Sequence, residues 1–173
     1  MTSLADTREK LIFDLANRRI SREAFLRSYG SGETGENISL SLLEKGALDH
    51  DAVKVELGIV VGSVFGFSDS HKRILSKIST AEWHHSHEDI VSALGKLEDP
   101  GLEGLFVKMT EFVPSNLRWD QNRALARKAL YELARLRTVT AHEKITNIAR
   151  SRDQVLSRTA HELLKAWTHN QTP

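Results

Sequence analysis

Apolar residues recur at helical spacing almost without interruption from Asn37 to Trp167, and this pattern constrains the fold more than any other feature of the sequence. No stretch alternates apolar and polar residues for long, and no Asn-Gly or Asp-Gly dipeptide suggests a β-hairpin turn. The pattern therefore predicts an all-α protein.

Short breaks divide the pattern into helices, and most breaks contain a residue that starts or ends a helix. A first helix ends near Arg19, Ser21 can cap a short second one, Gly66 fits a helix end, and Pro100 fits a first helical position. The glycine-rich stretch 30–36 predicts a mobile loop. The main predicted helices span residues 37–48, 51–65, 68–79, 86–97, 100–112, 120–135, 138–150 and 153–167.

Length and composition favour one folded domain over residues 1–173. The chain has no cysteine, which excludes disulfide bonds and fits a reducing compartment, although it would equally fit a simple periplasmic domain. Charged residues between Asp6 and Asp14 interrupt the apolar core that a secretion signal needs. The most apolar window, Leu57 to Phe67, holds eleven residues, whereas a bilayer-spanning helix needs roughly twenty. We therefore expect a cytoplasmic protein that does not cross or bind a membrane.

A small residue followed four positions later by leucine occurs in three of the predicted helices. Successive occurrences are 36 and 31 residues apart, a period typical of stacked helical repeats in which a small side chain lets the next helix approach closely. The pattern favours an α-solenoid of antiparallel helical pairs over a generic helical bundle. The pairs are Ala93 with Leu97, Ala129 with Leu133, and Ala160 with Leu164.

The run from Ile90 to Leu105, with its Asp99-Pro100 turn between two helices, resembles a HEAT repeat. Three short segments also follow one another in an order similar to that in small bacterial HEAT-repeat proteins. Those proteins act as immunity proteins against polymorphic or contact-delivered toxins. This resemblance implies a HEAT-like solenoid whose partner is a cognate toxin domain, as in contact-dependent growth inhibition. The further segments that carry the resemblance are 127–148 as a degenerate repeat, 153–164 as the first helix of a third repeat, and 20–26, 65–67 and 83–90 for the order along the chain.

Three histidines and two acidic residues fall between His84 and Asp89, which raises the question of a metal site. Residues on one helix face lie three or four positions apart, so only a pair such as His84 and His87 could bind one ion. A complete site would need ligands from elsewhere. We therefore expect a helix start or a partner-binding segment here, and no metal.

No motif supports catalysis or a bound cofactor. The His50-Asp51 pair resembles the HD pair of metal phosphohydrolases, but His50 is the first histidine of the chain and those enzymes need another upstream. The chain contains no His-Glu-x-x-His run, no Gly-x-x-x-x-Gly-Lys-Ser/Thr phosphate loop and no Gly-x-Ser-x-Gly elbow. The sequence predicts a binding protein that is not an enzyme and uses no cofactor.

Gly58, Gly62 and Gly66 recur at every fourth position of one predicted helix. In a lipid bilayer this spacing favours helix dimerisation, whereas in a water-soluble chain it indicates close packing of a second backbone on that face. We expect close packing.

A tryptophan at the edge of a helix either fills the end of the core or acts as a binding hot spot. Two of the tryptophans in this chain stand beside charged groups. We predict that these tryptophans and their polar neighbours form a partner-binding edge near the starts of successive helices. The predicted partner-binding residues are Trp83, His84, His87, Glu88, Trp119, Asp120 and Arg123.

The alternative function is nucleic-acid binding by a basic C-terminal face. The net charge of the whole chain is only +1, but the segment from Asp120 to Lys165 holds ten basic and five acidic residues. Such a segment, with Trp119 and Trp167 nearby, could hold phosphate groups and stack on bases. The acidic remainder of the chain would repel phosphate, so we favour a protein partner.

Overall fold

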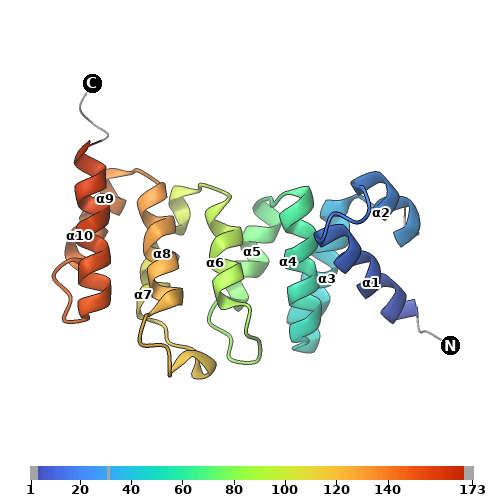
Figure 1. Ribbon diagram of the computed structural model, residues 1–173, viewed down its shortest axis with the longest axis horizontal. Helices are drawn as coiled ribbons and strands as arrows, with labels where there is room; N and C mark the ends of the chain where they lie inside the picture. Colours follow the sequence, from blue (N-terminus) through green and yellow to red (C-terminus); the bar gives the residue numbers. More distant parts are fainter. Residues whose placement is uncertain (1–3, 31, 170–173) are drawn as a thin grey trace. The chain divides into compact units, whose positions relative to one another are not determined.

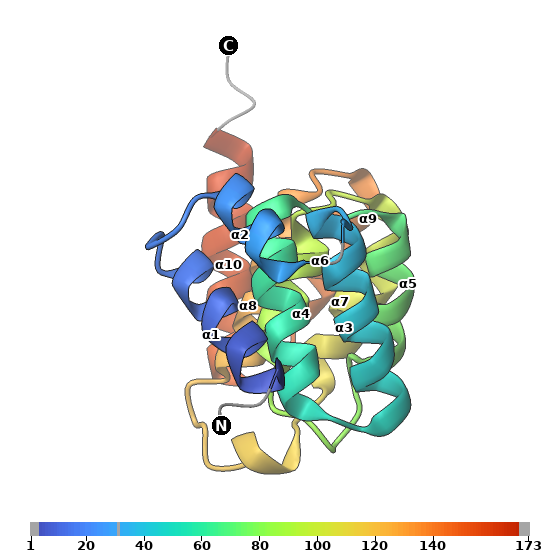
Figure 2. The same cartoon turned by 90° about the vertical axis from the view of Figure 1, so that its right-hand side faces the viewer.

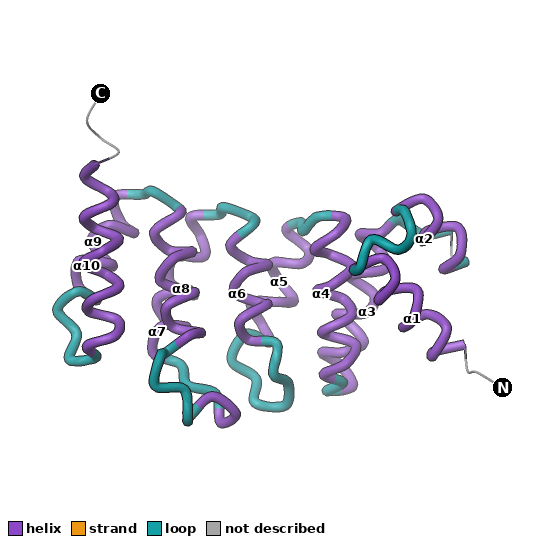
Figure 3. The backbone as a smooth tube through the Cα atoms, in the orientation of Figure 1, coloured by secondary structure: helices purple, strands orange, loops and turns teal. Residues whose placement is uncertain are grey.

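The computed structural model describes residues 4–30 and 32–169, and within these ranges it contains ten α-helices, two short 3-10 helices and no strand (Figures 1 and 3). The all-α prediction is confirmed. In the same ranges no helix is long and apolar enough to cross a membrane. The chain divides into two compact units: unit 1 is Met1–Ile78 with Trp83–Ser86, and unit 2 is Ser79–Glu82 with His87–Pro173.

Unit 1 contains the first five helices, and its centre is the pair α3 and α4, which lie side by side (Figure 2). Helix α1 packs on α2 and α4, while α5 packs on α3. The core where these helices meet includes Ile12, Phe25, Ile38 and Val61, all at most 1% exposed. The helices are α1 (Leu4–Ala16), α2 (Arg22–Tyr29), α3 (Gly35–Asp49), α4 (Ala52–Phe65) and α5 (Asp69–Ile78).

Side-chain caps determine where α2 and α3 begin. The hydroxyl of Ser21 accepts a hydrogen bond from the backbone N–H of Ala24 at 3.2 Å, which confirms the predicted cap. Thr34 caps α3 in the same way, so this helix begins two residues before the predicted start. Gly30 ends α2 with φ +78°, a conformation that favours glycine. Of the stretch predicted to be a mobile loop, Ser31 lies outside the described residues.

The close approach predicted on the glycine face of α4 is confirmed at two of the three positions. A Cβ atom on Gly58 would lie 2.8 Å from Cγ of Leu43, and one on Gly62 would overlap the Phe67 ring and lie 2.9 Å from Oγ of Ser39. Leu43 and Ser39 belong to α3, so the missing side chains let the two helices pack closely. Gly66 differs, because it follows α4 with φ +106° and a Cβ there would meet nothing within 4 Å.

A chain of hydrogen bonds through the buried His71 joins α5 to α3 and α4. The backbone N–H of Ser68 donates to Nδ1 of His71 at 3.1 Å, so the ring proton sits on Nε2. Nε2 then donates to Oγ of Ser39 at 3.1 Å, and this hydroxyl donates to the carbonyl of Gly58 at 2.7 Å. Burial lowers the pKa of His71, which keeps the ring neutral.

Unit 2 is built around α8, which packs against α6, α7, α9 and α10. In Figure 1, α6, α8 and α10 lie in one layer, with α7 and α9 behind them. The small residues Ala93, Ala129 and Ala160 of the three front helices are all buried, as the spacing of Ala and Leu predicts. The helices are α6 (His87–Gly95), α7 (Glu103–Glu111), α8 (Ala124–Arg135), α9 (Val139–Ile148) and α10 (Gln154–His169).

Two helix starts in unit 2 differ from the prediction. Helix α8 begins at Ala124, four residues after the predicted start at Asp120, because Gln121 and Asn122 form a turn and Arg123 adopts φ +53°. The predicted helix from Pro100 begins as a 3-10 turn, which the Asp99 carboxylate caps, and becomes α-helical at Glu103.

Candidate partner-binding site

The connection between α7 and α8, residues 112–123, carries three of the predicted partner-binding residues, and we call it the Trp119 loop. Glu82 anchors the first half of this loop, because its carboxylate oxygen Oε2 accepts two hydrogen bonds from Ser115. The backbone N–H of Ser115 donates at 3.0 Å and its hydroxyl at 2.7 Å. These bonds lower the pKa of Glu82. The neighbouring Pro114 is buried, so this half of the loop is anchored to unit 2.

The second half of the loop is fastened by Asp120 and Arg123. One carboxylate oxygen of Asp120 accepts from the N–H of Asn122 at 2.9 Å, and the other accepts from the N–H of Ala124, the first residue of α8, at 2.6 Å. The Arg123 guanidinium donates to the carbonyl of Thr110 at 3.0 Å and lies 3.2 Å from Asp153. Both side chains therefore hold the loop in place.

Trp119 lies between these anchors and is 76% exposed. Its indole N–H donates to the backbone carbonyl of Asn116 at 2.7 Å, so the polar atom of the ring is satisfied within the loop. Val113 on the same loop is also exposed, at 38%. The loop thus presents a large apolar ring, fixed at its polar edge, to the solvent.

His84 lies in unit 1 and is buried. The backbone N–H of Ser86 donates to its Nδ1 at 3.2 Å, which leaves Nε2 to donate to the carbonyl of Ile78 at 2.8 Å. Desolvation lowers the pKa of His84, so the ring is neutral. Trp83 stacks on His50 with ring centroids 5.1 Å apart and is half-buried.

His87 and Glu88 lie at the start of α6 in unit 2. His87 is buried, donates from Nε2 to the carbonyl of Ala81 at 3.0 Å, and packs against the Phe112 ring. Glu88 is half-buried and lies 3.4 Å from the ammonium of Lys128. The acidic first turn expected for this helix is present, since Glu88 is followed by Asp89.

The structure brings together Trp119, Asp120 and Arg123, which lie in one loop. Of these three, Trp119 offers the exposed apolar surface, while the other two act as anchors. The imidazoles of His84 and His87 point into the protein and bond to backbone carbonyls. We therefore centre the candidate site on Trp119 and Val113.

Sequence reasoning missed Val113, Glu82 and Ser115. Glu82 and Ser115 are 33 residues apart, and no local pattern indicates that one holds the other. Pro114 was a usable signal, because proline stiffens a loop and marks a position where the chain turns.

The described residues contain no group of three histidine, cysteine, aspartate or glutamate side chains placed to hold a metal ion. Comparisons of this chain with protein-family models, with characterised proteins and with solved structures found no match.

Proposed function

We propose that this chain is a protein-binding module and that the Trp119 loop is its binding hot spot. The observation that carries the proposal is the 76% exposure of Trp119 on a loop anchored at both ends. Tryptophan is the residue type most enriched at interface hot spots, and a loop that is already ordered loses little entropy on binding. Binding a partner would remove the apolar surface of the exposed indole from water, which is favourable.

The internal hydrogen bond of Trp119 indicates the chemistry of the partner pocket. Because the indole N–H already donates to Asn116, the partner does not need to supply an acceptor. The exposed face of the ring is apolar, so an apolar pocket on the partner complements it.

We further propose that the helices form a HEAT-like α-solenoid and that the partner is a toxin domain, which makes the chain an immunity protein. The two-layer packing of α6 to α10 supports the first part, together with the buried alanines of the three front helices. The second part rests on the resemblance of the sequence to bacterial immunity proteins.

Nucleic-acid binding has less support, because four of the ten basic side chains of segment 120–165 pair with acidic side chains. Arg123 pairs with Asp153, and Lys144 lies 2.6 Å from Glu103. Lys128 pairs with Glu88, and Arg135 lies 3.2 Å from Glu132. Such pairs leave fewer cations for phosphate than the charge count suggests.

The proposal is tested by capture from an extract of the source organism, with the wild-type chain and the Trp119→Ala variant immobilised side by side. We expect the wild type to retain a protein with a toxin domain and the variant to lose it. Salt-dependent DNA and RNA binding is measured in parallel. No partner, together with tight nucleic-acid binding that disappears on neutralising Arg123, Arg127 and Arg158, would contradict the proposal.

A further inference from the structure

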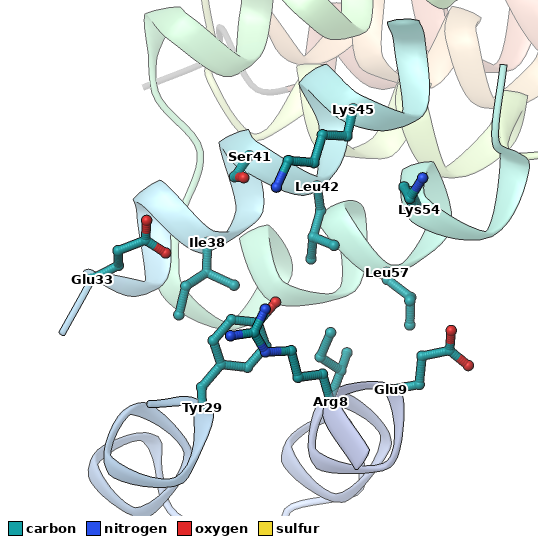
Figure 4. Close-up of a pocket in the computed structure, with 11 residues that line it drawn as sticks. Arg8, Glu9, Tyr29, Glu33, Ile38, Ser41, Leu42, Lys45, Lys54 and Leu57 are labelled. Atoms are coloured by element: carbon teal, nitrogen blue, oxygen red, sulfur yellow. The ribbon is translucent and has the colours of Figure 1, made fainter. Parts of the chain in front are cut away.

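A groove of about 410 Å³ lies within unit 1, between α1 and α3, and is separate from the Trp119 loop (Figure 4). One wall is the α3 face that carries Ile38, Leu42 and Lys45, and the opposite wall comes from α1. Leu57 of α4 and Tyr29 at the end of α2 complete the apolar lining. The volume falls in the range of about 300–1,000 Å³ that is typical of small-molecule sites.

Two cations line the middle of the groove on opposite walls. Figure 4 shows Arg8 of α1 lying over the Tyr29 ring and Lys45 of α3 extending toward Ser41. The Arg8 guanidinium is 4.8 Å from the centre of the Tyr29 ring, which fixes its position by a cation–π contact. The middle of the groove is therefore a cationic spot with a hydroxyl beside it.

The other charged groups lie at the two ends of the groove. Figure 4 places the Glu33 carboxylate at one end, beyond Ile38, and that of Glu9 at the other, beside Leu57. Lys54 also lies near this second end, but its ammonium is 3.0 Å from Asp49 and 3.1 Å from Asp51, so its charge is neutralised. The positive charge of Arg8 and Lys45 is thus confined to the middle.

We propose that this groove binds a small apolar carboxylic acid. The carboxylate lies between Arg8 and Lys45, where both cations can donate charge-assisted hydrogen bonds. The hydrocarbon part lies along Leu42 and Leu57, which form the apolar lining toward the second end. The carboxylates at the two ends keep a second negative group out, so the site selects a monocarboxylate.

Calorimetric titration with three probes that share an eight-carbon chain tests the proposal: octanoate, octanol and octyltrimethylammonium, all below the concentrations at which they aggregate. We expect saturable 1:1 binding of octanoate, roughly tenfold tighter than binding of the neutral or cationic probe. Equal affinity for all three, or no saturable binding of octanoate, overturns the proposal.

Two variants with the same change at different places locate the site. Lys45→Met removes a cation of the groove, and Lys10→Met removes an exposed cation of α1 that does not line it. We expect octanoate binding to weaken about tenfold in the first and to stay unchanged in the second. Methyl resonances of Ile38, Leu42 and Leu57 should shift on titration. Equal effects of the two variants, or shifts confined to other residues, overturn the proposal.

Discussion

His84 in unit 1 and Trp119 in unit 2 both satisfy their ring N–H groups with backbone carbonyls, but in opposite surroundings. His84 donates to Ile78 and is 0% exposed, whereas Trp119 donates to Asn116 and is 76% exposed. The first hydrogen bond lies in the core, where the His84 ring cannot contact a partner. The second removes the polar atom of an exposed ring and leaves its apolar face available. A ring whose N–H group is hydrogen-bonded in the core stabilises the fold, whereas a ring whose N–H group is hydrogen-bonded at the surface can bind a partner.

The largest effect on stability is expected for the buried residue, His84. His84→Ala removes a buried ring and leaves the carbonyl of Ile78 and the N–H of Ser86 without their partner. We expect the free energy of unfolding, measured with urea, to fall by about 3 kcal/mol. The matched control is His85→Ala at the exposed neighbouring position, which should change it by less than about 0.5 kcal/mol. Equal effects of the two variants would contradict the conclusion that the buried His84 ring stabilises the fold.

The second prediction concerns pH. Burial lowers the pKa values of His71 and His84 below the ordinary 6.5 of the unfolded chain, so the unfolded state binds more protons in acid. Their contribution to stability is complete above pH 6.5 and is lost as the pH falls toward the native pKa values. The slope approaches about 1.4 kcal/mol per pH unit for each histidine.

Urea unfolding between pH 7.5 and 5.5 measures this slope in a range above the ordinary pKa values of carboxylates. The His84→Gln variant should show a smaller slope than the wild type, because it lacks one of the two groups. A free energy of unfolding that stays constant over this range would show that these histidines are not buried in neutral form.

A smaller effect is expected at the anchor of the Trp119 loop. Ser115→Ala removes the hydroxyl that donates to Glu82 but keeps the backbone hydrogen bond. We expect a loss of about 1 kcal/mol in the local opening free energy, seen as faster amide hydrogen exchange in residues 113–119. Gln121→Ala, at an exposed position of the same loop, is the control. Unchanged exchange in Ser115→Ala would mean that the anchor does not order the loop.

The smallest effect on stability is expected for Trp119→Ala. The ring makes one hydrogen bond and is mostly in contact with water, so its removal should change the free energy of unfolding by no more than about 0.5 kcal/mol. Circular dichroism and urea unfolding measure the result. A loss comparable to that of His84→Ala would assign the ring to the core.

Most helices could be predicted from the sequence, because apolar spacing, caps and breaking residues act within a few positions of each other. The cap at Ser21 and the close approach at Gly58 and Gly62 are examples. The start of α8 was predicted wrongly because Asp120 occupies its carboxylate with the N–H groups of Asn122 and Ala124, and Arg123 takes a left-handed conformation. These choices depend on how the whole loop packs.

The candidate site could be predicted only in part. A tryptophan beside charged residues indicates either a core plug or a hot spot, and only tertiary structure separates the two. Trp119 is exposed on a loop that is anchored by Glu82, 33 residues before Ser115. The groove in unit 1 was missed because its walls come from α1 and α3, two helices that are 18 residues apart in the sequence, and its cations look like ordinary surface residues in the sequence.

The most direct test of the central claim is the affinity of the captured protein partner for Trp119→Ala, compared with Tyr131→Ala. Both residues are exposed aromatic side chains of unit 2, at 76% and 46%, but only Trp119 belongs to the anchored loop. We predict that the dissociation constant rises about thirtyfold or more for Trp119→Ala, equivalent to about 2 kcal/mol, and stays unchanged for Tyr131→Ala. Wild-type affinity in the Trp119→Ala variant, with its helical content intact, would contradict the account.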